Sequence, residues 1–233
     1  MYPSIPEARK VEEEEMTAKR RVRVYGRHSS NFYAPQHIRT RRPSRSTIIV
    51  TGTPGTGKTT FSKNLAKELG AYYIPLTQFV LNRKLYSGFD SRRKTRIVNL
   101  ARARASLRVL LTAPGSTIVD THLPEGVVPE SFVRLVFVLR CHPRTLEKRL
   151  ARKRWNSDKI RENVLAEILD ACLTSAIKCY GRRRVAQLNT SHISVGKCVS
   201  KAKRFLRGNV PKTVKVDWIE TLEKENSLDR YLG

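Results

Sequence analysis

The chain has 233 residues, enough for one or two domains and for a core that needs no disulfide or metal to hold it together. Its 46 Lys and Arg residues against 20 Asp and Glu give a formal net charge of +26, which attracts polyanions such as nucleic acid, nucleotides or an anionic membrane surface. No stretch approaches the roughly 20 apolar residues of a membrane span, and no secretory signal or zinc-ligand spacing of the four cysteines is present. We therefore expect an intracellular protein with free thiols and no membrane partner, cytoplasmic or, in a eukaryote, nuclear.

The charge divides the chain into three parts. Residues 1–46 hold 11 basic and 5 acidic residues, with scattered prolines and no apolar period, and we expect a basic, flexible N-terminal arm. Residues 47–210 hold 31 basic and 10 acidic residues, so most of the excess positive charge belongs to the expected folded domain. Residues 211–233 hold 4 basic and 5 acidic residues and form a distinct tail. Three apolar residues at helical spacing, with Trp218 beside them, predict a short amphipathic helix in this tail: Val216, Ile219 and Leu222.

Strand and helix signals alternate through the middle part. Short apolar, β-branched runs predict strands over residues 46–52, 71–75, 116–121, 135–140 and 185–189. Helical periodicity predicts helices over residues 58–70, 94–111, 143–154, 159–180 and 194–208. Gly70 suits the end of the first helix, and Pro143 suits the start of the third. This alternation predicts an α/β domain in which helices flank a parallel sheet.

The strongest motif is a phosphate-binding loop. Residues 52–59 read Gly-Thr-Pro-Gly-Thr-Gly-Lys-Thr, preceded by a predicted strand and followed by a predicted helix. Glycines allow the backbone to wrap closely around phosphates, and the N–H groups of the loop and the helix N-terminus bind anions. In such a loop Lys58 supplies charge to the β- and γ-phosphates, and the Thr59 hydroxyl coordinates Mg²⁺. The motif predicts binding of a nucleoside triphosphate with Mg²⁺.

A second element, Asp120, stands at the end of a predicted buried strand, where open α/β sheets place ligand groups. We expect its carboxylate to hold the water shell of the metal. His122 lies on the same side if the chain stays extended, and together with the phosphate loop it is a candidate catalytic residue. The alternative is that His122 is an ordinary loop residue.

Clusters of cations form a third element. One cluster ends the helix predicted over residues 143–154, and it either closes over the transferring phosphate or forms a solvated basic face: Arg149, Arg152, Lys153 and Arg154. A second set lies on the helix predicted around residues 94–111 and in a later run: Arg92, Arg93, Lys94, Arg96, Arg102, Arg104, Arg108 and Arg182–Arg184. We expect this second set to grip the phosphate backbone of RNA without reading bases.

The order of the segments TGTPGTGKTT, KLYSGFD, IVDTHLPEGVVPE, LVFVLRCHPRTLEKRL and RENVLAEI resembles the adenylate kinase isoenzyme six family, nucleotide kinase-like NTPases involved in small ribosomal subunit maturation. The resemblance covers about residues 47–210 and implies an adenylate kinase-like P-loop fold with a short lid around residues 152–163. It implies catalytic roles for Lys58, Asp120 and His122, metal binding by Thr59 and Asp120, and a lid cation at Lys153, with Arg154 adjacent. It implies ATP contacts from five residues: Gly55, Gly57, Lys58, Thr59 and Thr60.

The chain also departs from the family. The stretch that reads Gly-Asp-x-x-x-Arg in the family and helps form the monophosphate site is Thr-Gln-Phe-Val-Leu-Asn over residues 77–82. Neither the Asp nor the Arg is present: Gln78 stands at the position of the Asp, and Leu81 and Asn82 end the stretch where the family has Arg. This puts efficient phosphorylation of AMP in doubt.

The leading hypothesis is an ATP-binding phosphotransferase or ATPase in small ribosomal subunit maturation, with ATP and ADP as ligands, AMP as a candidate acceptor, and rRNA and a small-subunit ribosomal protein as partners. One alternative is a kinase of a small molecule or nucleoside monophosphate. It needs a shaped acceptor pocket between residues 76 and 112, against which the many arginines there argue. The other is a nucleotide-switched module that binds RNA or a ribosomal protein.

Overall fold

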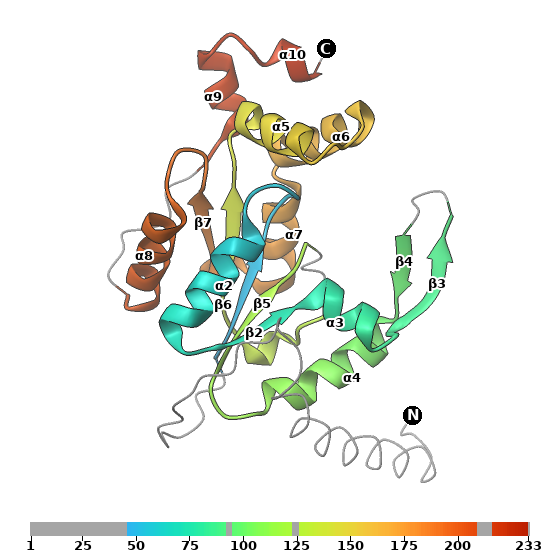
Figure 1. Ribbon diagram of the computed structural model, residues 1–233. Coiled ribbons are helices and arrows are strands. Elements are labelled where there is room, and N and C mark those ends of the chain that lie inside the picture. Colours follow the sequence, from blue (N-terminus) through green and yellow to red (C-terminus); the bar gives the residue numbers. More distant parts are fainter. Residues whose placement is uncertain (1–45, 92–94, 123–125, 209–215, 233) are drawn as a thin grey trace.

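A computed structural model describes residues 46–91, 95–122, 126–208 and 216–232 (Figure 1). The predicted N-terminal arm, the basic residues 92–94 and the first part of the predicted tail lie outside these ranges.

A five-stranded parallel sheet forms the centre, in the order β2-β5-β1-β6-β7. Its strands are β1 (Ser46–Thr51), β2 (Tyr72–Pro75), β5 (Ser116–Asp120), β6 (Val133–Arg140) and β7 (Val185–Asn189). Val50 of β1 is in register with Asp120 of β5 and with Phe137 of β6. The predicted parallel sheet is confirmed, and the carboxyl ends of its strands meet at one edge, where the phosphate loop follows β1.

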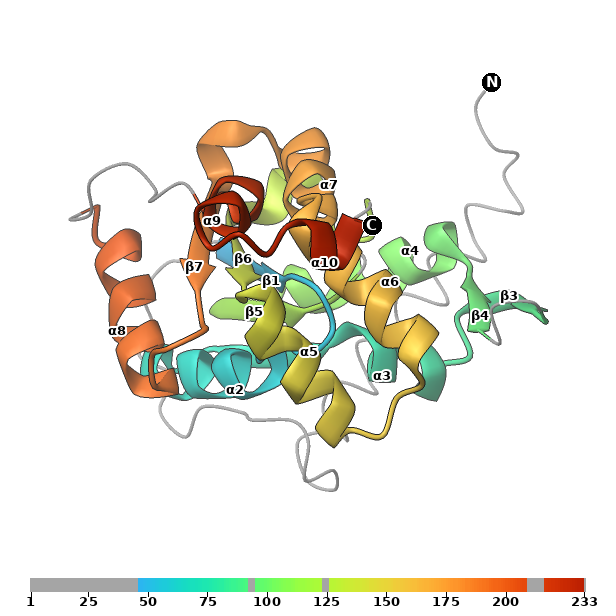
Figure 2. The same cartoon turned by 90° about the horizontal axis from the view of Figure 1, so that it is seen from above.

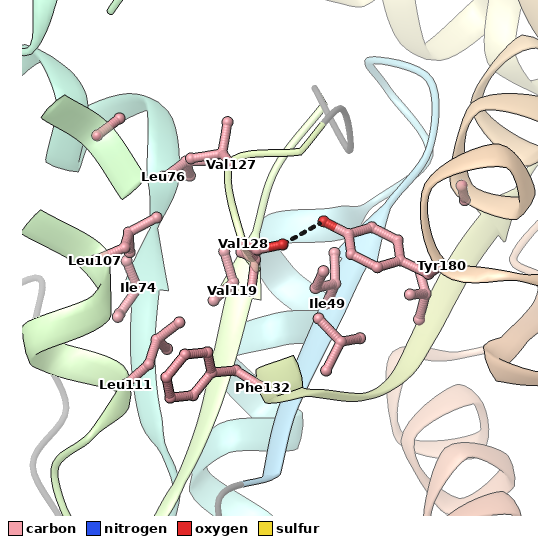
Figure 3. Packing of buried hydrophobic residues seen from close by; sticks show 14 of the residues in the cluster. Ile49, Ile74, Leu76, Leu107, Leu111, Val119, Val127, Val128, Phe132 and Tyr180 are labelled. Atoms are coloured by element: carbon pink, nitrogen blue, oxygen red, sulfur yellow. Dashed lines mark hydrogen bonds between the residues drawn. The ribbon is translucent and has the colours of Figure 1, made fainter. Parts of the chain in front are cut away.

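Helices cover both faces of this sheet. Two of them pack on one face: α2 (Lys58–Leu69) and α8 (Val195–Leu206). Three pack on the other: α3 (Leu76–Asn82), α4 (Leu100–Leu111) and α7 (Ala171–Tyr180). Figure 3 shows the second layer, where Leu107 and Leu111 of α4 approach Ile74 and Val119 of the sheet. Burying such side chains stabilises the fold by about 1.5–3 kcal/mol each.

A third layer lies over the carboxyl edge of the sheet (Figures 1 and 2). It consists of α5 (Pro143–Arg152), α6 (Ser157–Ile168), α9 (Trp218–Lys224) and α10 (Asp229–Leu232). The buried hydrophobic residues of the described tail are Val216, Trp218, Leu222 and Tyr231. Ile219, which we expected on the buried face, is 38% exposed, because the buried stripe of α9 runs through Trp218 and Leu222.

The helix predicted over residues 94–111 is wrong in its first part. Thr95–Val98 forms strand β4, which pairs antiparallel with β3 (Tyr86–Asp90) in a hairpin that projects from the body of the molecule (Figure 1). The helix begins only after Asn99, whose side chain accepts a hydrogen bond from the Arg102 N–H at 3.1 Å. The β-branched run before Asn99 favours a strand, and the Asn99 cap starts the helix. Arg96 therefore lies on a strand, and only the later arginines lie on α4.

The long helix predicted over residues 159–180 is also wrong, because α6 and α7 are separate. The chain turns at Asp170, which has a left-handed conformation with φ 57°. The Arg140 guanidinium donates to the Glu167 carbonyl oxygen at 3.0 Å, and this oxygen would accept the Ala171 N–H if the helix continued. Arg140 also forms an ion pair with Asp170, so a contact from a distant strand fixes the break.

A candidate nucleotide-binding site at the carboxyl edge of the sheet

The phosphate loop connects β1 to α2. Gly55 and Gly57 both have φ of 94°, a region that favours glycine. A Cβ at Gly55 would lie 2.8 Å from a Leu146 methyl carbon, so the loop packs tightly against α5 at this point. Gly57 caps α2 without a side-chain hydrogen bond, which leaves the first N–H groups of the helix available for an anion.

Lys58 begins α2 and folds back over the loop. Its Nζ donates to the Gly52 carbonyl oxygen at 2.7 Å and to the Thr53 carbonyl oxygen at 3.1 Å. Burial lowers the pKa of Lys58, and the nearby Asp120 carboxylate opposes this effect. The ammonium group is thus held on the loop itself, within the space where phosphates would bind.

Asp120, the last residue of β5, is buried beside this lysine. Its Oδ2 accepts hydrogen bonds from the Thr59 hydroxyl at 2.8 Å and from the Tyr73 hydroxyl at 3.2 Å. A hydroxyl and a carboxylate in contact fit the hard-oxygen preference of Mg²⁺. Within the described ranges, no cluster of three or more His, Cys, Asp or Glu side chains is able to hold a metal alone, so phosphate and water oxygens would complete the shell.

His122 follows Asp120 by two residues and lies at the mouth of the site. Its Nδ1 is 3.4 Å from the Thr77 hydroxyl of α3. Desolvation lowers the pKa of His122, and the Lys58 cation lowers it further, while Asp120 acts in the opposite direction. The imidazole is therefore neutral at pH 7.

A cavity of about 590 Å³ opens over the loop and extends to α8. The five predicted ATP-contact residues line it, together with Arg149, Arg152 and Lys153 from the end of α5. Arg154 is not among the lining residues. Arg149 donates to the Thr190 carbonyl oxygen at 3.0 Å, which ties α5 to the loop after β7. Sequence reasoning missed the far wall: Thr190, Ile193, Val195 and Cys198.

Comparisons with known proteins show the family of the chain. A family model described as an AAA domain matches residues 48–170. A protein of Methanocaldococcus jannaschii named "Putative adenylate kinase" is 30% identical over 173 residues, 74% of this chain and 93% of that protein. The "Adenylate kinase isoenzyme 6 homolog FAP7" of Saccharomyces cerevisiae is 36% identical over 144 residues, 61% of this chain and 72% of that protein. The chain belongs to the adenylate kinase isoenzyme 6 family.

Comparison with a solved structure confirms the predicted fold. A solved shikimate kinase from Acinetobacter baumannii in complex with shikimate is similar over 71% of this chain and 95% of that one, with a TM-score of 0.51 and 15% identity. This likeness concerns the P-loop kinase fold alone. No helix in the described part of the chain is both long and apolar enough to cross a membrane.

A second cavity, of about 310 Å³, lies beside His122 in this adenylate kinase isoenzyme 6 family member. Its lining comes from α3, the β3–β4 hairpin and the segment after β5: Leu76, Thr77, Val80, Leu81, Phe89, Arg96, Val98, Thr121, His122 and Val127. The argument that the arginines between residues 76 and 112 exclude a shaped pocket is therefore wrong. Among the arginines of that stretch that the structure describes, Arg96 alone lines the cavity, and its guanidinium stacks 4.1 Å from the centre of the Tyr86 ring.

Proposed function

We propose that this protein is an adenylate kinase-like phosphotransferase that binds ATP with Mg²⁺ and also hydrolyses ATP. The observation that carries the proposal is the convergence of Lys58, Thr59 and Asp120 on a glycine-rich loop that borders a cavity of about 590 Å³. Membership of the adenylate kinase isoenzyme 6 family supports the same activity.

Each of these residues has a role in phosphoryl transfer. Lys58 leaves the Gly52 and Thr53 carbonyl oxygens and donates to the β- and γ-phosphates, where a desolvated cation stabilises the transition state strongly. Thr59 and Asp120 would hold Mg²⁺, which supplies charge neutralisation at the phosphate oxygens when bound. The cations of α5, above all Lys153, face the same cavity and complete the electrostatic clamp.

His122 lines the second cavity, and its pKa responds to Lys58, which lines the first, so it suits the acceptor side of the reaction. Its lowered pKa keeps the ring neutral, so that one nitrogen is free to accept a proton or to orient the attacking hydroxyl or water. Thr77, at 3.4 Å, helps to set the orientation of the ring.

The lining of the second cavity bears on AMP as an acceptor. A phosphate group needs several cations or N–H donors, and within the described residues Arg96 is the one arginine in the lining. Gln78, where the family has Asp, is not part of the lining. We therefore propose that AMP is a poor acceptor. The existence of the cavity itself favours a second candidate function, phosphorylation of another small molecule.

We further propose that the protein acts in small ribosomal subunit maturation, with rRNA and a small-subunit ribosomal protein as partners. The net charge of +21 on residues 47–210 supports an RNA partner. Exposed cations on α4 and α8 belong to this excess: Arg102, Arg104, Arg108, Lys197, Lys201 and Arg204. A nucleotide-switched binding module without turnover remains the third candidate.

One experiment separates these functions. ADP release is measured with ATP and Mg²⁺ alone, with AMP added, and with ribosomal RNA or small-subunit proteins added. We expect slow basal release that RNA or a ribosomal protein stimulates and AMP does not. Stimulation by AMP alone would favour the nucleoside monophosphate kinase, and nucleotide-dependent RNA binding without ADP release would favour the switch.

A further inference from the structure

A buried carboxylate connects the C-terminal tail to the phosphate loop. Glu167 of α6 is only 2% exposed, and its two oxygens serve different partners. Oε2 accepts a hydrogen bond from the Thr53 hydroxyl of the phosphate loop at 2.6 Å. Oε1 accepts from the Trp218 indole N–H of the tail at 2.9 Å and from Arg140 at 2.8 Å. One side chain therefore bridges segments more than 100 positions apart in the sequence.

The connection continues to the catalytic lysine. The Thr53 carbonyl oxygen accepts the Lys58 Nζ at 3.1 Å, and it also accepts the Thr56 hydroxyl at 2.8 Å. The backbone position of Thr53 therefore sets both the turn of the loop and the resting place of the Lys58 ammonium group. Three hydrogen bonds in series join Trp218 to Lys58.

The tail is fixed firmly enough to act on this network. The Trp218 ring packs edge-on against the His142 ring, with 5.3 Å between the centroids. His142 contacts Glu225 at 3.1 Å, and Arg230 contacts Glu147 at 2.8 Å. These contacts fix α9 and α10 on α5 and α6, so the indole N–H of Trp218 is held toward Glu167 Oε1.

Apolar packing and these two polar contacts already join the tail to α5 and α6, and the hydrogen bond of Trp218 is an additional feature. Tyr231, at the other end of the tail, is buried with a hydroxyl that has no hydrogen-bond partner within the described residues. The tail thus tolerates an unmatched polar group at Tyr231, within the third layer. At Trp218 the donor is matched to the Glu167 carboxylate, which in turn contacts the phosphate loop.

We infer that the C-terminal tail is a positioning element of the nucleotide site: Trp218 orients the Glu167 carboxylate, which holds Thr53 and thereby the loop that carries Lys58. Removal of the indole N–H leaves Oε1 to Arg140 and the Cys141 N–H, so the carboxylate turns toward β6 and its hold on the Thr53 hydroxyl weakens. The inference rests on the proposed function, since it assumes that nucleotide binds at this loop.

The first test uses tryptophan fluorescence. The chain has two tryptophans, so in a Trp155→Phe background Trp218 is the one that emits. Mg²⁺-ADP is titrated while calorimetry measures binding independently. We expect the Trp218 emission to change with the same Kd as calorimetry gives, and we expect Thr53→Ala to remove this change while ADP still binds. ADP binding with an unchanged Trp218 emission would overturn the inference alone, whereas absence of ADP binding would overturn the proposed function together with it.

The second test separates positioning from stability. Trp218→Phe keeps an aromatic ring, removes the N–H donor and shortens the buried side chain, so the Tm of the variant is measured beside its kcat. We expect it to lower kcat for ATP hydrolysis about tenfold with a smaller change in KM, since misplacement of a catalytic group by about 1 Å costs up to about 100-fold. Tyr231→Phe, which removes the unmatched hydroxyl from the same tail, is the matched control and should keep wild-type kcat. A Trp218→Phe protein with a lower Tm but wild-type kcat below its unfolding transition would overturn the inference.

Discussion

Lys58 is the residue on which the proposed ATP chemistry depends most directly. Its ammonium group already lies against the Gly52 and Thr53 carbonyl oxygens, within the loop that would hold the phosphates. We predict that Lys58→Ala lowers ATP turnover by at least about 100-fold, the typical cost of losing one group that stabilises transition-state charge. ADP release measures the effect. Lys63→Ala, on the exposed face of the same helix, is the control, and wild-type turnover in Lys58→Ala would refute the site.

Asp120 separates binding from catalysis. Its carboxylate accepts from Thr59 and Tyr73, and we propose that it supports the Mg²⁺ shell. Asp120→Asn keeps the shape of the side chain and removes the charge. We predict that kcat falls far more than the affinity for ATP, because the phosphate loop still binds the phosphates. Parallel measurements of kcat and of the ATP Kd check this, and equal losses in both would contradict it.

His122 gives the reaction a pH dependence. Desolvation lowers its pKa below the ordinary value near 6.5, so the ring stays neutral at pH 7 and becomes protonated only in more acidic solution. We predict that kcat for ATP hydrolysis is level near neutral pH and falls as pH decreases through this lowered pKa. His122→Ala should have a lower plateau and lack this fall. If His122→Ala and Asp120→Asn both hydrolyse ATP at the wild-type rate, His122 is an ordinary loop residue.

At the scale of elements, two ion pairs join helices of the third layer to their neighbours, and substitutions in them measure how much each pair stabilises the fold. Arg140 and Glu167 are almost fully buried and 2.8 Å apart, whereas the side chains of Arg230 and Glu147 are 54% and 35% exposed. We predict that Glu167→Ala lowers the free energy of unfolding by about 3–5 kcal/mol, because a buried guanidinium loses a partner. Glu147→Ala should cost at most about 1 kcal/mol. Urea unfolding of both variants measures the difference, and similar losses would show that the buried pair has no special weight.

The sequence predicts most of this architecture because most signals are local. Apolar β-branched runs mark the strands, and Gly70 and Pro143 mark the helix ends that the structure contains. The two wrong helices have identifiable causes. A run of β-branched residues before Asn99 pairs with a strand, and Arg140 reaches from another strand to end α6 at Asp170. Periodicity does not carry such information about distant partners.

The candidate site could likewise be predicted only where its signals are local. The phosphate loop and the position of Asp120 at a strand end are local patterns, so both could be predicted. The contact between Thr53 and Glu167 joins residues 114 positions apart, and the far wall of the nucleotide cavity comes from residues after β7. The sequence indicates the residues of this wall only through their place after a strand, at the carboxyl edge of a parallel sheet.

At the scale of the whole molecule, positive charge is spread over both faces of the sheet. Helix α8 carries four cations and no acidic residue, and three of them are exposed at a spacing that forms one stripe: Lys197, Lys201 and Arg204. The first turn of the same helix contributes Val195 and Cys198 to the nucleotide cavity. On the opposite face, the exposed arginines of α4 are Arg102, Arg104 and Arg108. A phosphate backbone bound along α8 would therefore lie next to the bound nucleotide.

The last prediction concerns RNA. Because residues 47–210 carry a net +21 against +6 in residues 1–46, we predict that the folded domain supplies most of the affinity. Log affinity should fall linearly with log salt, by about 0.7 per single-strand phosphate contact, and removal of residues 1–46 should reduce this slope only partly.

Charge reversal at Lys197, Lys201 and Arg204 should weaken binding to unrelated RNA sequences alike and leave basal ATP hydrolysis unchanged, since phosphate contacts carry no base information. Charge reversal at Arg92, Arg93 and Arg96 should also weaken RNA binding. If the protein is instead a small-molecule kinase, these variants should show a raised KM for the acceptor. RNA binding without salt dependence, or binding lost entirely with the arm, would contradict this view of the molecule.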